Sequence, residues 1–492
     1  MAATTASAPT YRLPFVIAAS SAGTIIEWYD FYLYGVLVGF FSTQFFPKED
    51  PNTALLVSLA TFGAGFAVRP FGAAVFGRIG DIIGRKFTFL VTILVMGIST
   101  VLVGVLPTYA QIGIAAPLIL VGLRLAQGLA LGGEYGGAAI YVAEHSPDHD
   151  RGKNTSWIQT TATLGLLLAM IVIFITRTSM TPEDFSSFGW RIPFLLSAVL
   201  VVIALFIRLR LQETPLFARL KDQGKSTTSP WRESFGSWKS ARGILLVLFG
   251  MTAGQAVVWY QGQFQALFFL QNVEGVKFQD AYFIVGTAIV LATPFFYVFG
   301  RLSDQIGRKK VILSGCLIAA LSYYPIYNLM TMFAHPQGVL ATTGANAGKF
   351  VDEAGKLTVA QPEILPLIAL VWIQVVFVTM VYGPIAAFLV EYFPARIRYT
   401  SLSIPYHLGN GWFGGFLPLI AAALLTSTGN LYAGLIYPIT VALITVVVGG
   451  LYIKESRHVK IWDEVGGIDG KAADVRPSAP PEAVIQGGGL SG

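Results

Sequence analysis

Charge and cysteine are both scarce in this sequence. Only 12% of its 492 residues are Asp, Glu, Lys or Arg, about half of the roughly 25% that is usual in a soluble domain. So few charges cannot cover the surface of a soluble protein of this length. The composition therefore argues against a soluble enzyme, a nucleic-acid-binding protein and a disordered chain.

Cys316 is the only cysteine, and there are five histidines. A single cysteine excludes an intramolecular disulfide and a thiolate metal site, and the histidines show no metal-ligand spacing. The sequence also lacks a G-x-x-x-x-G-K-[ST] phosphate loop, an H-E-x-x-H motif and a G-x-S-x-G elbow in the strand-to-helix context that it requires. We expect no bound metal, no cofactor, no ATP-driven step and no enzymatic activity.

Apolar residues, in contrast, make up 54% of the chain, and the mean hydropathy is +0.63. At about 20 residues per span, the chain has room for about a dozen membrane helices. The first apolar run is too long for a signal peptide and contains two acids, so we predict an uncleaved first span. The predicted fold class is therefore an all-α integral membrane protein with twelve transmembrane helices. These helices are predicted at 14–42, 53–76, 87–107, 111–141, 155–176, 192–211, 243–271, 281–300, 311–333, 365–390, 400–425 and 431–453.

The positions of Lys and Arg predict the orientation of the chain. With both termini in the cytoplasm, the cytoplasmic segments hold 25 Lys and Arg and the external loops hold six, as the positive-inside rule requires. The predicted organisation is a cytoplasmic N-terminus (1–13), a six-helix bundle (14–211), a cytoplasmic linker (212–242), a second six-helix bundle (243–453) with a long external loop (335–364), and a disordered cytoplasmic tail (454–492).

Two motifs occur twice, once in each half. The pattern G-x-x-x-D-x-x-G-R-K stands at 77–86 and again at 300–309, and E-x-x-P-x-x-x-R stands at 144–151 and again at 391–398. Both motifs fall at predicted cytoplasmic helix ends. The repeat predicts two pseudo-symmetric six-helix bundles, an organisation that is typical of secondary transporters with a binding site at midplane between the halves.

Each repeated motif contains an acid and an arginine. An acid near a helix N-terminus and an arginine near a carboxylate are both favourable, so these groups could latch the cytoplasmic side of a rocking transporter. The alternative is that the loops are ordinary positive-inside turns. The predicted gate residues are Asp81, Arg85, Glu144 and Arg151 in the first half and Asp304, Arg308, Glu391 and Arg398 in the second.

The motifs at 77–86 and 300–309 resemble the signature loop of the major facilitator superfamily, and Arg124-x-x-Gln127-Gly128 is similar to its second motif. Within that superfamily, four further stretches resemble the metabolite:proton symporter family. They are Glu27-Trp-Tyr-Asp-Phe31, Gly132-Gly-Glu-Tyr-Gly-Gly137, Trp190-Arg-Ile-Pro-Phe194 and Glu213-Thr-Pro-Leu-Phe217. The resemblance implies proton-coupled uptake of small organic acids or zwitterions across a bacterial inner (plasma) membrane. The Gly-Pro motif of drug/proton antiporters is absent from 160–169, which argues against export.

Glu27 and Asp30 are three residues apart, so they lie on one face of the first predicted helix, near mid-membrane. A charged acid there costs about 2.5–3.5 kcal/mol on insertion scales, and burial favours proton uptake. We predict that one of them carries the proton, with Asp30 as first choice. The alternative is a carboxylate paired permanently with an arginine.

Arg124 also lies near midplane, in the fourth predicted helix. Arginine stays charged there and offers a planar fork to a carboxylate, so it could bind the solute, pair with Asp30, or serve only as scaffold. Glu134 is expected to be structural, whereas Arg69 and His407 have no assigned role. The predicted substrate-binding residues are Arg124, Gln127, Tyr29, Gln255, Trp259, Tyr382 and Asn410. The alternative for the aromatic and amide side chains is helix–helix contact or an interfacial belt.

The sequence thus predicts a transporter that imports a small carboxylate with protons by alternating access. A first alternative is uptake of a zwitterion such as a betaine or an amino acid, with Trp259 or Tyr29 facing its ammonium group. A non-transporting nutrient sensor and a membrane-embedded hydrolase are weaker alternatives. The expected partners are a small organic anion or zwitterion, protons and the lipid bilayer, for a chain that acts as a monomer.

Overall fold

The computed structural model describes residues 13–46, 51–83, 85–209, 227, 229–340, 350–351 and 357–461. The first half comprises α1 (Leu13–Val36), α2 (Val38–Phe45), α3 (Pro51–Ala67), α4 (Arg69–Ile82), α5 (Arg85–Val105), α6 (Tyr109–Ile112), α7 (Ala115–His145), η1 (Asp148–Asp150), α8 (Arg151–Thr178), α9 (Pro182–Ser187), η2 (Gly189–Arg191) and α10 (Ile192–Leu209).

The second half begins with α12 (Pro230–Phe235), α13 (Trp238–Val247), η3 (Leu248–Thr252), α14 (Ala253–Trp259), η4 (Tyr260–Gln265), α15 (Ala266–Phe268) and η5 (Phe269–Val273). It continues with α16 (Phe278–Ala292), α17 (Pro294–Ile306), α18 (Arg308–Ala334), β1 (Val339–Leu340), β2 (Phe350–Val351), α19 (Ile364–Tyr382), α20 (Ile385–Tyr392), η6 (Ala395–Ile397), α21 (Arg398–Leu408), η7 (Gly409–Gly414), α22 (Leu417–Thr428), η8 (Ala433–Leu435) and α23 (Ile436–Tyr452).

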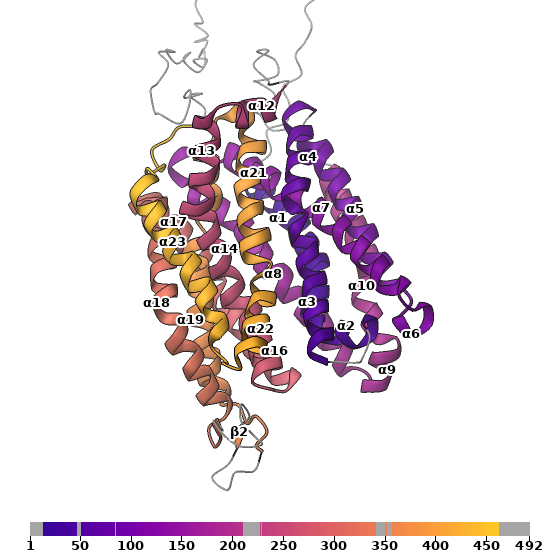
Figure 1. Cartoon of the computed structure of the whole chain (residues 1–492). Coiled ribbons are helices and arrows are strands. Elements are labelled where there is room, and N and C mark those ends of the chain that lie inside the picture. Colours follow the sequence, from indigo (N-terminus) through magenta and orange to yellow (C-terminus); the bar gives the residue numbers. More distant parts are fainter. Residues whose placement is uncertain are drawn as a thin grey trace, which may run out of the picture.

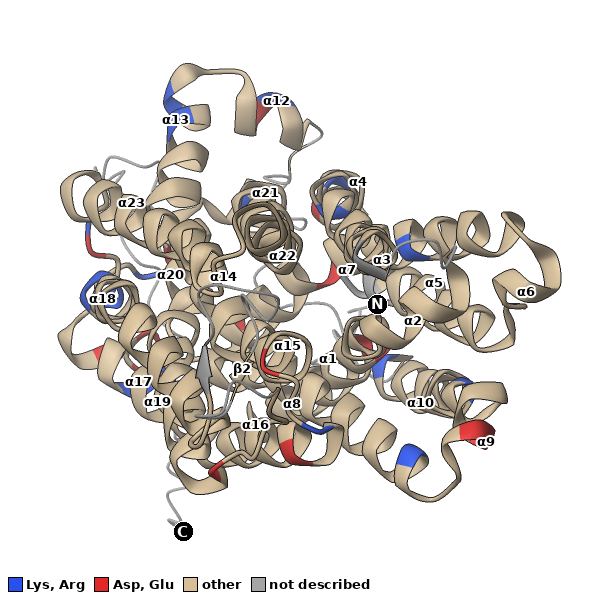
Figure 2. Cartoon of the chain, turned by 60° about the horizontal axis from the view of Figure 1, so that its bottom comes forward, with Lys and Arg blue, Asp and Glu red and all other residues tan. Residues whose placement is uncertain are grey.

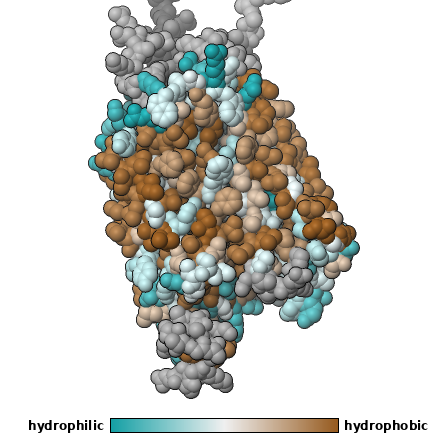
Figure 3. Space-filling model, viewed as in Figure 1, coloured by the Kyte–Doolittle hydropathy of each residue, from teal (hydrophilic) through white to brown (hydrophobic). Residues whose placement is uncertain are grey.

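The predicted all-α membrane fold is confirmed. Within the described residues, ten helical stretches are long and apolar enough to cross a membrane, and Leu90–Val105 in α5 is a shorter apolar helix. The remaining predicted span is α1 with α2, whose middle carries Glu27 and Asp30. Figure 3 shows a band of hydrophobic side chains around the middle of the bundle and hydrophilic side chains at its two ends, as a membrane-spanning protein requires.

Several spans are interrupted along their length. The first two break at Leu37 and Val68, and α19 ends at Tyr382 just before the Gly383-Pro384 step, because proline cannot donate the next helical hydrogen bond. The seventh and eleventh spans contain π-helical turns. Such turns often occur at functional sites, and here they lie in helices that face the centre of the molecule.

Both ends of the described chain lie at one end of the bundle, together with α12, at the top of Figure 1. We call this end the terminal face. The opposite face carries α6, α9 and a small antiparallel sheet in which Val339 pairs with Val351 and Leu340 with Phe350. Viewed towards the opposite face, the first-half helices α3, α4, α5 and α10 lie on one side and the second-half helices α17, α18, α19 and α23 on the other (Figure 2).

The two halves meet along two main helix pairs, α4 with α21 and α8 with α17. Glycine makes the second approach possible, since a Cβ at Gly152 would lie 2.6 Å from the carbonyl oxygen of Gly300. The seventh helical span begins at Trp238, before its predicted start at 243, and α12 lies inside the segment predicted as a linker. Residues 1–12, most of the linker (210–226 and 228) and the tail after 461 lie outside the described residues.

Candidate functional site

The two halves are joined at the terminal face by hydrogen bonds to buried acids. Asp81, at the end of α4, accepts hydrogen bonds from the backbone N–H of Thr400 (3.0 Å) and from its hydroxyl (2.7 Å) at the start of α21. Beside it, Arg398 of α21 contacts Glu144 of α7 at 3.2 Å. An acid at a helix N-terminus is favourable because the exposed N–H groups and the helix dipole both attract negative charge.

The second copy of the motif makes the matching contact in the other direction. Asp304, at the end of α17, accepts hydrogen bonds from the backbone N–H groups of Gly152 and Lys153 at the start of α8, each at 2.8 Å. Arg151 and Arg308 both contact Glu391 of α20, at 2.8 and 3.0 Å. Each half therefore caps a helix of the other half, as the internal repeat leads one to expect.

The repeated motifs place an acid and an arginine in each half, but the sequence does not specify which acid pairs with which arginine. In the structure, Arg398 contacts Glu144 and Arg151 contacts Glu391, so each of these arginines reaches the other half. The side chain of Arg85 lies outside the described residues. Because the contacts join the halves, they hold the terminal face closed.

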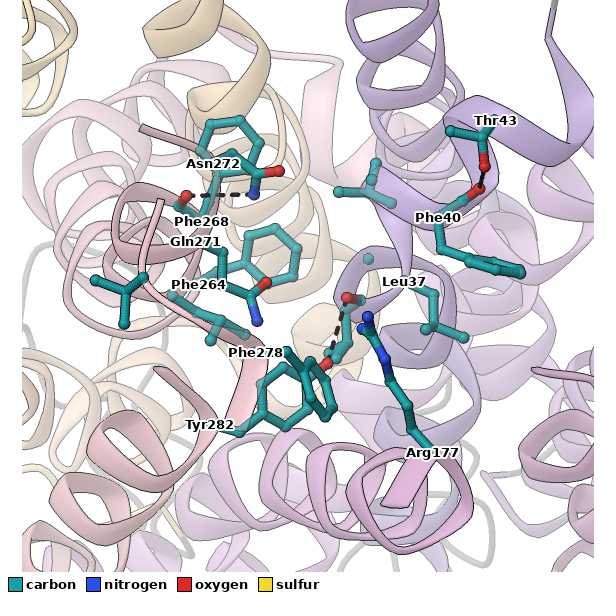
Figure 4. A pocket seen from close by; sticks show the side chains of 16 residues that line it. Leu37, Phe40, Thr43, Arg177, Phe264, Phe268, Gln271, Asn272, Phe278 and Tyr282 are labelled. Atoms are coloured by element: carbon teal, nitrogen blue, oxygen red, sulfur yellow. Dashed lines mark hydrogen bonds between the residues drawn. The ribbon is translucent and has the colours of Figure 1, made fainter. Parts of the chain in front are cut away.

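The opposite face, in contrast, holds a cavity between the halves. It has a volume of about 370 Å³ and is lined by α1, α2 and the end of α8 on one side and by the seventh span and α16 on the other (Figure 4). Arg177 projects into it, with its guanidinium carbon 4.1 Å from the ring centroid of Phe278. We call this cavity the vestibule.

Aromatic side chains separate the vestibule from the centre of the molecule. Phe264 stacks on Phe62 with ring centroids 4.9 Å apart, and a Cβ at Gly35 would lie within 3 Å of both rings. On the side of this layer that faces the terminal face, Tyr32 stacks on Trp259 with ring centroids 5.5 Å apart. Both contacts join the two halves, so the centre is covered from the vestibule side as well.

Arg69 lies at the centre, fully buried, at the start of α4. None of its three guanidinium nitrogens has a hydrogen-bond partner among the described residues. Its guanidinium carbon is 5.2 Å from the ring centroid of Trp28 and 5.3 Å from that of Phe66. A Cβ at Gly132 would lie 2.2 Å from the Arg69 carbonyl oxygen, so glycine lets α7 pack directly behind this arginine.

Hydroxyl and imidazole groups lie within electrostatic range of this guanidinium. It interacts electrostatically with Tyr32 of α1 and with four groups of the second half. Those four are Tyr260, Tyr382, Tyr406 and His407. The Tyr260 hydroxyl, the Trp259 indole N–H and both His407 nitrogens are buried without hydrogen-bond partners among the described residues. We call Arg69 and these aromatic neighbours the central cluster.

Three of the predicted substrate-binding residues lie in or beside this cluster and are already engaged. Gln255 and Asn410 hydrogen bond to each other in both directions, at 3.2 and 3.1 Å. Tyr382 hydrogen bonds through its hydroxyl to that of Tyr406 at 2.6 Å. Trp259, the fourth, has no hydrogen-bond partner for its indole N–H among the described residues and packs edge-on to Tyr382.

Arg124 and Gln127 lie in a separate network within the first half. One nitrogen of Arg124 donates to the carbonyl of Phe31 (3.2 Å) and to the side chain of Gln127 (2.7 Å), which in turn donates to Thr100. The Arg124 guanidinium lies over Phe31, with its carbon 4.4 Å from the ring centroid. Its Nε and Nη2 have no hydrogen-bond partner among the described residues, and it interacts electrostatically with Tyr260 of the central cluster.

Asp30 and Tyr29 both face α10 inside the first half. The Tyr29 hydroxyl donates to the carbonyl of Pro193 at 2.6 Å, and the Ser197 hydroxyl donates to Asp30 at 2.5 Å. The second Asp30 oxygen is buried without a hydrogen-bond partner among the described residues. No ion pair joins Asp30 to Arg124 within the described part of the chain.

Glu27 belongs to a third buried group. Arg208, at the end of α10, hydrogen bonds to Glu134 of α7 and lies 3.4 Å from an oxygen of Glu27. Thr24 also donates to Glu134, at 3.1 Å. Both oxygens of Glu27 and Oε2 of Glu134 have no hydrogen-bond partner among the described residues. We call Glu27, Arg208 and Glu134 the acid–base triad.

The sequence left Arg69 without a role, expected Glu134 to be structural, and used Arg208 only as evidence of orientation. Their signals were present, because a charged residue inside a membrane helix is costly and usually functional. Hydropathy gives the depth of such a residue but not the direction in which its side chain points. No group of three or more His, Cys, Asp or Glu that could hold a metal occurs among the described residues.

Known proteins resemble this chain along most of its length. A family model described as sugar (and other) transporter matches residues 15–233, and one described as MFS/sugar transport protein matches residues 137–352. The inner membrane metabolite transport protein YhjE of Escherichia coli K12 is 35% identical over 449 residues, which cover 90% of this chain and 94% of YhjE.

The glycine betaine/proline/ectoine/pipecolic acid transporter OusA of Dickeya dadantii is 32% identical over 459 residues, which cover 91% of this chain and 84% of OusA. A crystal structure of a D-xylose-proton symporter shares the fold, with a TM-score of 0.64 at 19% identity over 92% of this chain and 100% of that chain.

Proposed function

The chain belongs to the major facilitator superfamily of membrane transporters, and from that premise we propose that it imports a small carboxylate together with protons. A transporter rather than an enzyme was expected from the sequence. The proposed route runs from the vestibule, past the aromatic layer, to the central cluster. We place the terminal face in the cytoplasm of a bacterial cell and the protein in its inner membrane, because Lys and Arg gather at that face.

The observation that carries the carboxylate proposal is the buried guanidinium of Arg69, which has no hydrogen-bond partner among the described residues. A buried cation without a hydrogen-bonded counter-group costs several kcal/mol, and a carboxylate with two oxygens matches the guanidinium fork. The neighbouring groups come from both halves, so a bound carboxylate would be released when the halves rock apart. We therefore assign the anion contact to Arg69 instead of Arg124, because one nitrogen of the Arg124 guanidinium is already held by Phe31 and Gln127, whereas all three nitrogens of Arg69 have no hydrogen-bond partner among the described residues.

A zwitterion is the second candidate, and the aromatic side chains favour it. Trp28, Tyr32 and Trp259 lie beside Arg69 in one stacked group, and aromatic faces attract quaternary or primary ammonium groups. The four solutes named for OusA all carry a carboxylate beside a positively charged nitrogen, which suits both parts of the cluster.

The conformation supports the direction of transport. The terminal face is closed by contacts between the halves, while the vestibule opens the other side. This is the arrangement expected before a solute enters from outside. The energy source in this proposal is the proton gradient, with no bound cofactor.

Counterflow in proteoliposomes tests the proposal without any gradient. Vesicles containing the purified chain are loaded with one unlabelled solute at a time, and entry of the same solute in radiolabelled form is measured. The solutes are glycine betaine, proline, 2-oxoglutarate, shikimate and xylose. Carboxylates should exchange and xylose should not. A pH gradient that is acidic outside the vesicles should then drive accumulation of the same solutes.

Arg69→Gln should reduce carboxylate counterflow by about 10- to 100-fold, because a hydrogen bond to a charged group contributes about 1.5–3 kcal/mol. Arg177→Gln, in the vestibule, is the matched arginine control and should change exchange much less. Exchange of xylose but of no carboxylate, or unchanged exchange in Arg69→Gln, would refute the carboxylate site.

A further inference from the structure

The acid–base triad contains one more acid than base. Glu27 and Glu134 both contact the single guanidinium of Arg208, and all three side chains are buried. If both glutamates are ionised, the triad carries a net negative charge inside the bundle. A buried charge without compensation is expensive, whereas one proton on either carboxylate makes the triad neutral.

Among the described residues, no cation other than Arg208 contacts either glutamate. On the triad's own helices, Asp30 of α1 is held by Ser197, and Arg124 of α7 is bound to Phe31 and Gln127. Besides α7 and α10, the helices that pack most extensively on α1 are α8 and α5. The sequence of α5 has charged residues only at its first two positions, and α8 has them only at Arg151, Lys153 and Arg177, near its ends.

We propose that Glu27 and Glu134 form a proton-binding site, bridged by Arg208, that drives solute movement through the central cluster. This inference deepens the proposed function, because it names the groups that hold the coupling proton. A proton enters from water on the vestibule side and binds one carboxylate, which becomes a neutral carboxylic acid. The same proton later leaves to water on the terminal side and restores the carboxylate.

The positions of the two acids connect the triad to the solute site. On α1, Glu27 directly precedes Trp28, whose ring lies 5.2 Å from the guanidinium carbon of Arg69. On α7, Glu134 directly precedes Tyr135, which stacks on Tyr406 of the second half at 3.5 Å. A change in the charge of the triad therefore acts on two helices that present their next residue to the central cluster.

The unpartnered oxygens give the proton a place to bind. Oε2 of Glu27 and Oε2 of Glu134 are each buried and accept no hydrogen bond from a described residue. Arg208 and Thr24 both contact the other oxygen of Glu134. A proton can therefore bind Oε2 of either acid without displacing these contacts.

An infrared titration tests the site without any solute. The purified full-length chain in lipid is titrated with acid while the C=O stretch of protonated carboxylic acids is recorded. We expect one such band to be lost in both Glu27→Gln and Glu134→Gln. The matched control is Glu274→Gln, a buried glutamate of the second half that contacts Thr331 and His335, and it should keep the band.

Glutamine has nearly the shape of a protonated glutamate, so both variants should fold, and elution from size exclusion checks this. If one of them does not fold, the other alone decides the result. A band that persists in the folded variant, or one that disappears in Asp30→Asn instead, would overturn the proposal.

Transport by the same variants tests the coupling. A gradient of one pH unit, acidic outside the vesicles, supports up to about tenfold accumulation of solute for each proton carried. In Glu27→Gln and Glu134→Gln this accumulation of glycine betaine or 2-oxoglutarate should fall to about one, a larger loss than that of counterflow. Full accumulation in both variants would overturn the triad as the coupling site. Absence of gradient-driven uptake in the parent would refute proton coupling instead, with the infrared result still deciding whether the triad binds a proton.

Discussion

The two halves share a fold and a pair of repeated motifs, but they differ in the polar groups that they bury. In the first half, Glu27, Asp30, Arg69, Arg124, Glu134 and Arg208 are buried between the helices. In the second half, the buried polar groups between helices are mainly neutral, namely Gln255, Gln261, Gln263, Gln374, His407 and Asn410. Amides cost less to bury than charges.

The difference indicates a division of work. In the proposed mechanism, ionisable groups in the first half bind a proton and a solute charge, and amides and aromatic rings in the second half provide the neutral surface against which the first half moves. The repeat therefore supplies a symmetric frame and a symmetric gate, whereas the chemistry is asymmetric. The following substitutions test this comparison.

The largest effect is expected from Arg208→Met. It leaves two buried carboxylates without their cation, which should lower stability by about 3–5 kcal/mol. Thermal unfolding of the detergent-purified protein, followed by the loss of the monodisperse peak, measures the change. The triple variant Glu27→Gln, Glu134→Gln, Arg208→Met should recover most of the loss, because no charge then remains in the triad.

Arg177→Met is the matched control for that experiment. Its guanidinium lies over aromatic rings beside the vestibule, so its removal should cost about 1 kcal/mol or less. If Arg208→Met is as stable as Arg177→Met, the carboxylates are not held by Arg208 as described.

The amide pair of the second half should be less sensitive. Asn410→Leu leaves the buried amide of Gln255 without its partner, which should cost about 1–3 kcal/mol. In the double variant Gln255→Leu, Asn410→Leu both polar groups are gone, and most of that loss should return. A double variant that is as unstable as the sum of the single ones would mean that the two amides do not act as a pair.

The sequence predicted the parts of this molecule that depend on depth and repetition. Long apolar runs predicted the helices, because membrane helices must be apolar along their length, and the repeated acid and arginine motifs predicted two related charge clusters. It did not predict which side chains meet. Asp30 and Arg124 lie at similar predicted depth, yet Asp30 contacts Ser197 and Arg124 contacts Phe31 and Gln127.

Those contacts depend on how each helix is rotated about its axis and on which helices are neighbours, and a single sequence gives neither. The same reason applies to Glu27, whose contact with Arg208 joins the first span to the end of the sixth. It applies also to Arg398, which contacts Glu144 of the other half.

The gate should respond by a smaller amount, and equally in the two halves. Asp81→Asn and Asp304→Asn each weaken a helix cap between the halves, worth about 1 kcal/mol. The terminal face should then open more often and solute turnover should slow. Ser403 is fully buried on α21 against Gly136, so Ser403→Cys in a Cys316→Ser background reports opening of this face. A thiol reagent should label this cysteine up to about fivefold faster in either gate variant than in the parent.

Asp280→Asn is the matched control, since Asp280 lies in the first turn of α16 on the opposite face. It should leave the labelling rate of Ser403→Cys unchanged. Parent-like labelling in both Asp81→Asn and Asp304→Asn would mean that these acids do not hold the gate and that the loops serve only as turns with positive charge.

The smallest effect is expected from a contact of the charge cluster formed by Asp304, Arg308, Glu391 and Arg151. After α23, the chain crosses the terminal face, where Glu455 accepts hydrogen bonds from the first two backbone N–H groups of α18 and Ser456 donates to Glu391 at 2.6 Å. Ser456→Ala removes one hydrogen bond, and because Glu391 keeps its contacts with Arg151 and Arg308 the loss should be about 0.5 kcal/mol, at the low end of the usual range. Labelling of Ser403→Cys should rise by less than in Asp304→Asn.

Double variants test whether the two charge clusters open separately. Ser456→Ala should raise the labelling rate by its usual factor in an Asp81→Asn background and by a smaller factor in an Asp304→Asn background. Ser456 and Asp304 act on the same cluster, and the effects of groups in one network do not add. Equal rises in both backgrounds would show that the two clusters open as one unit.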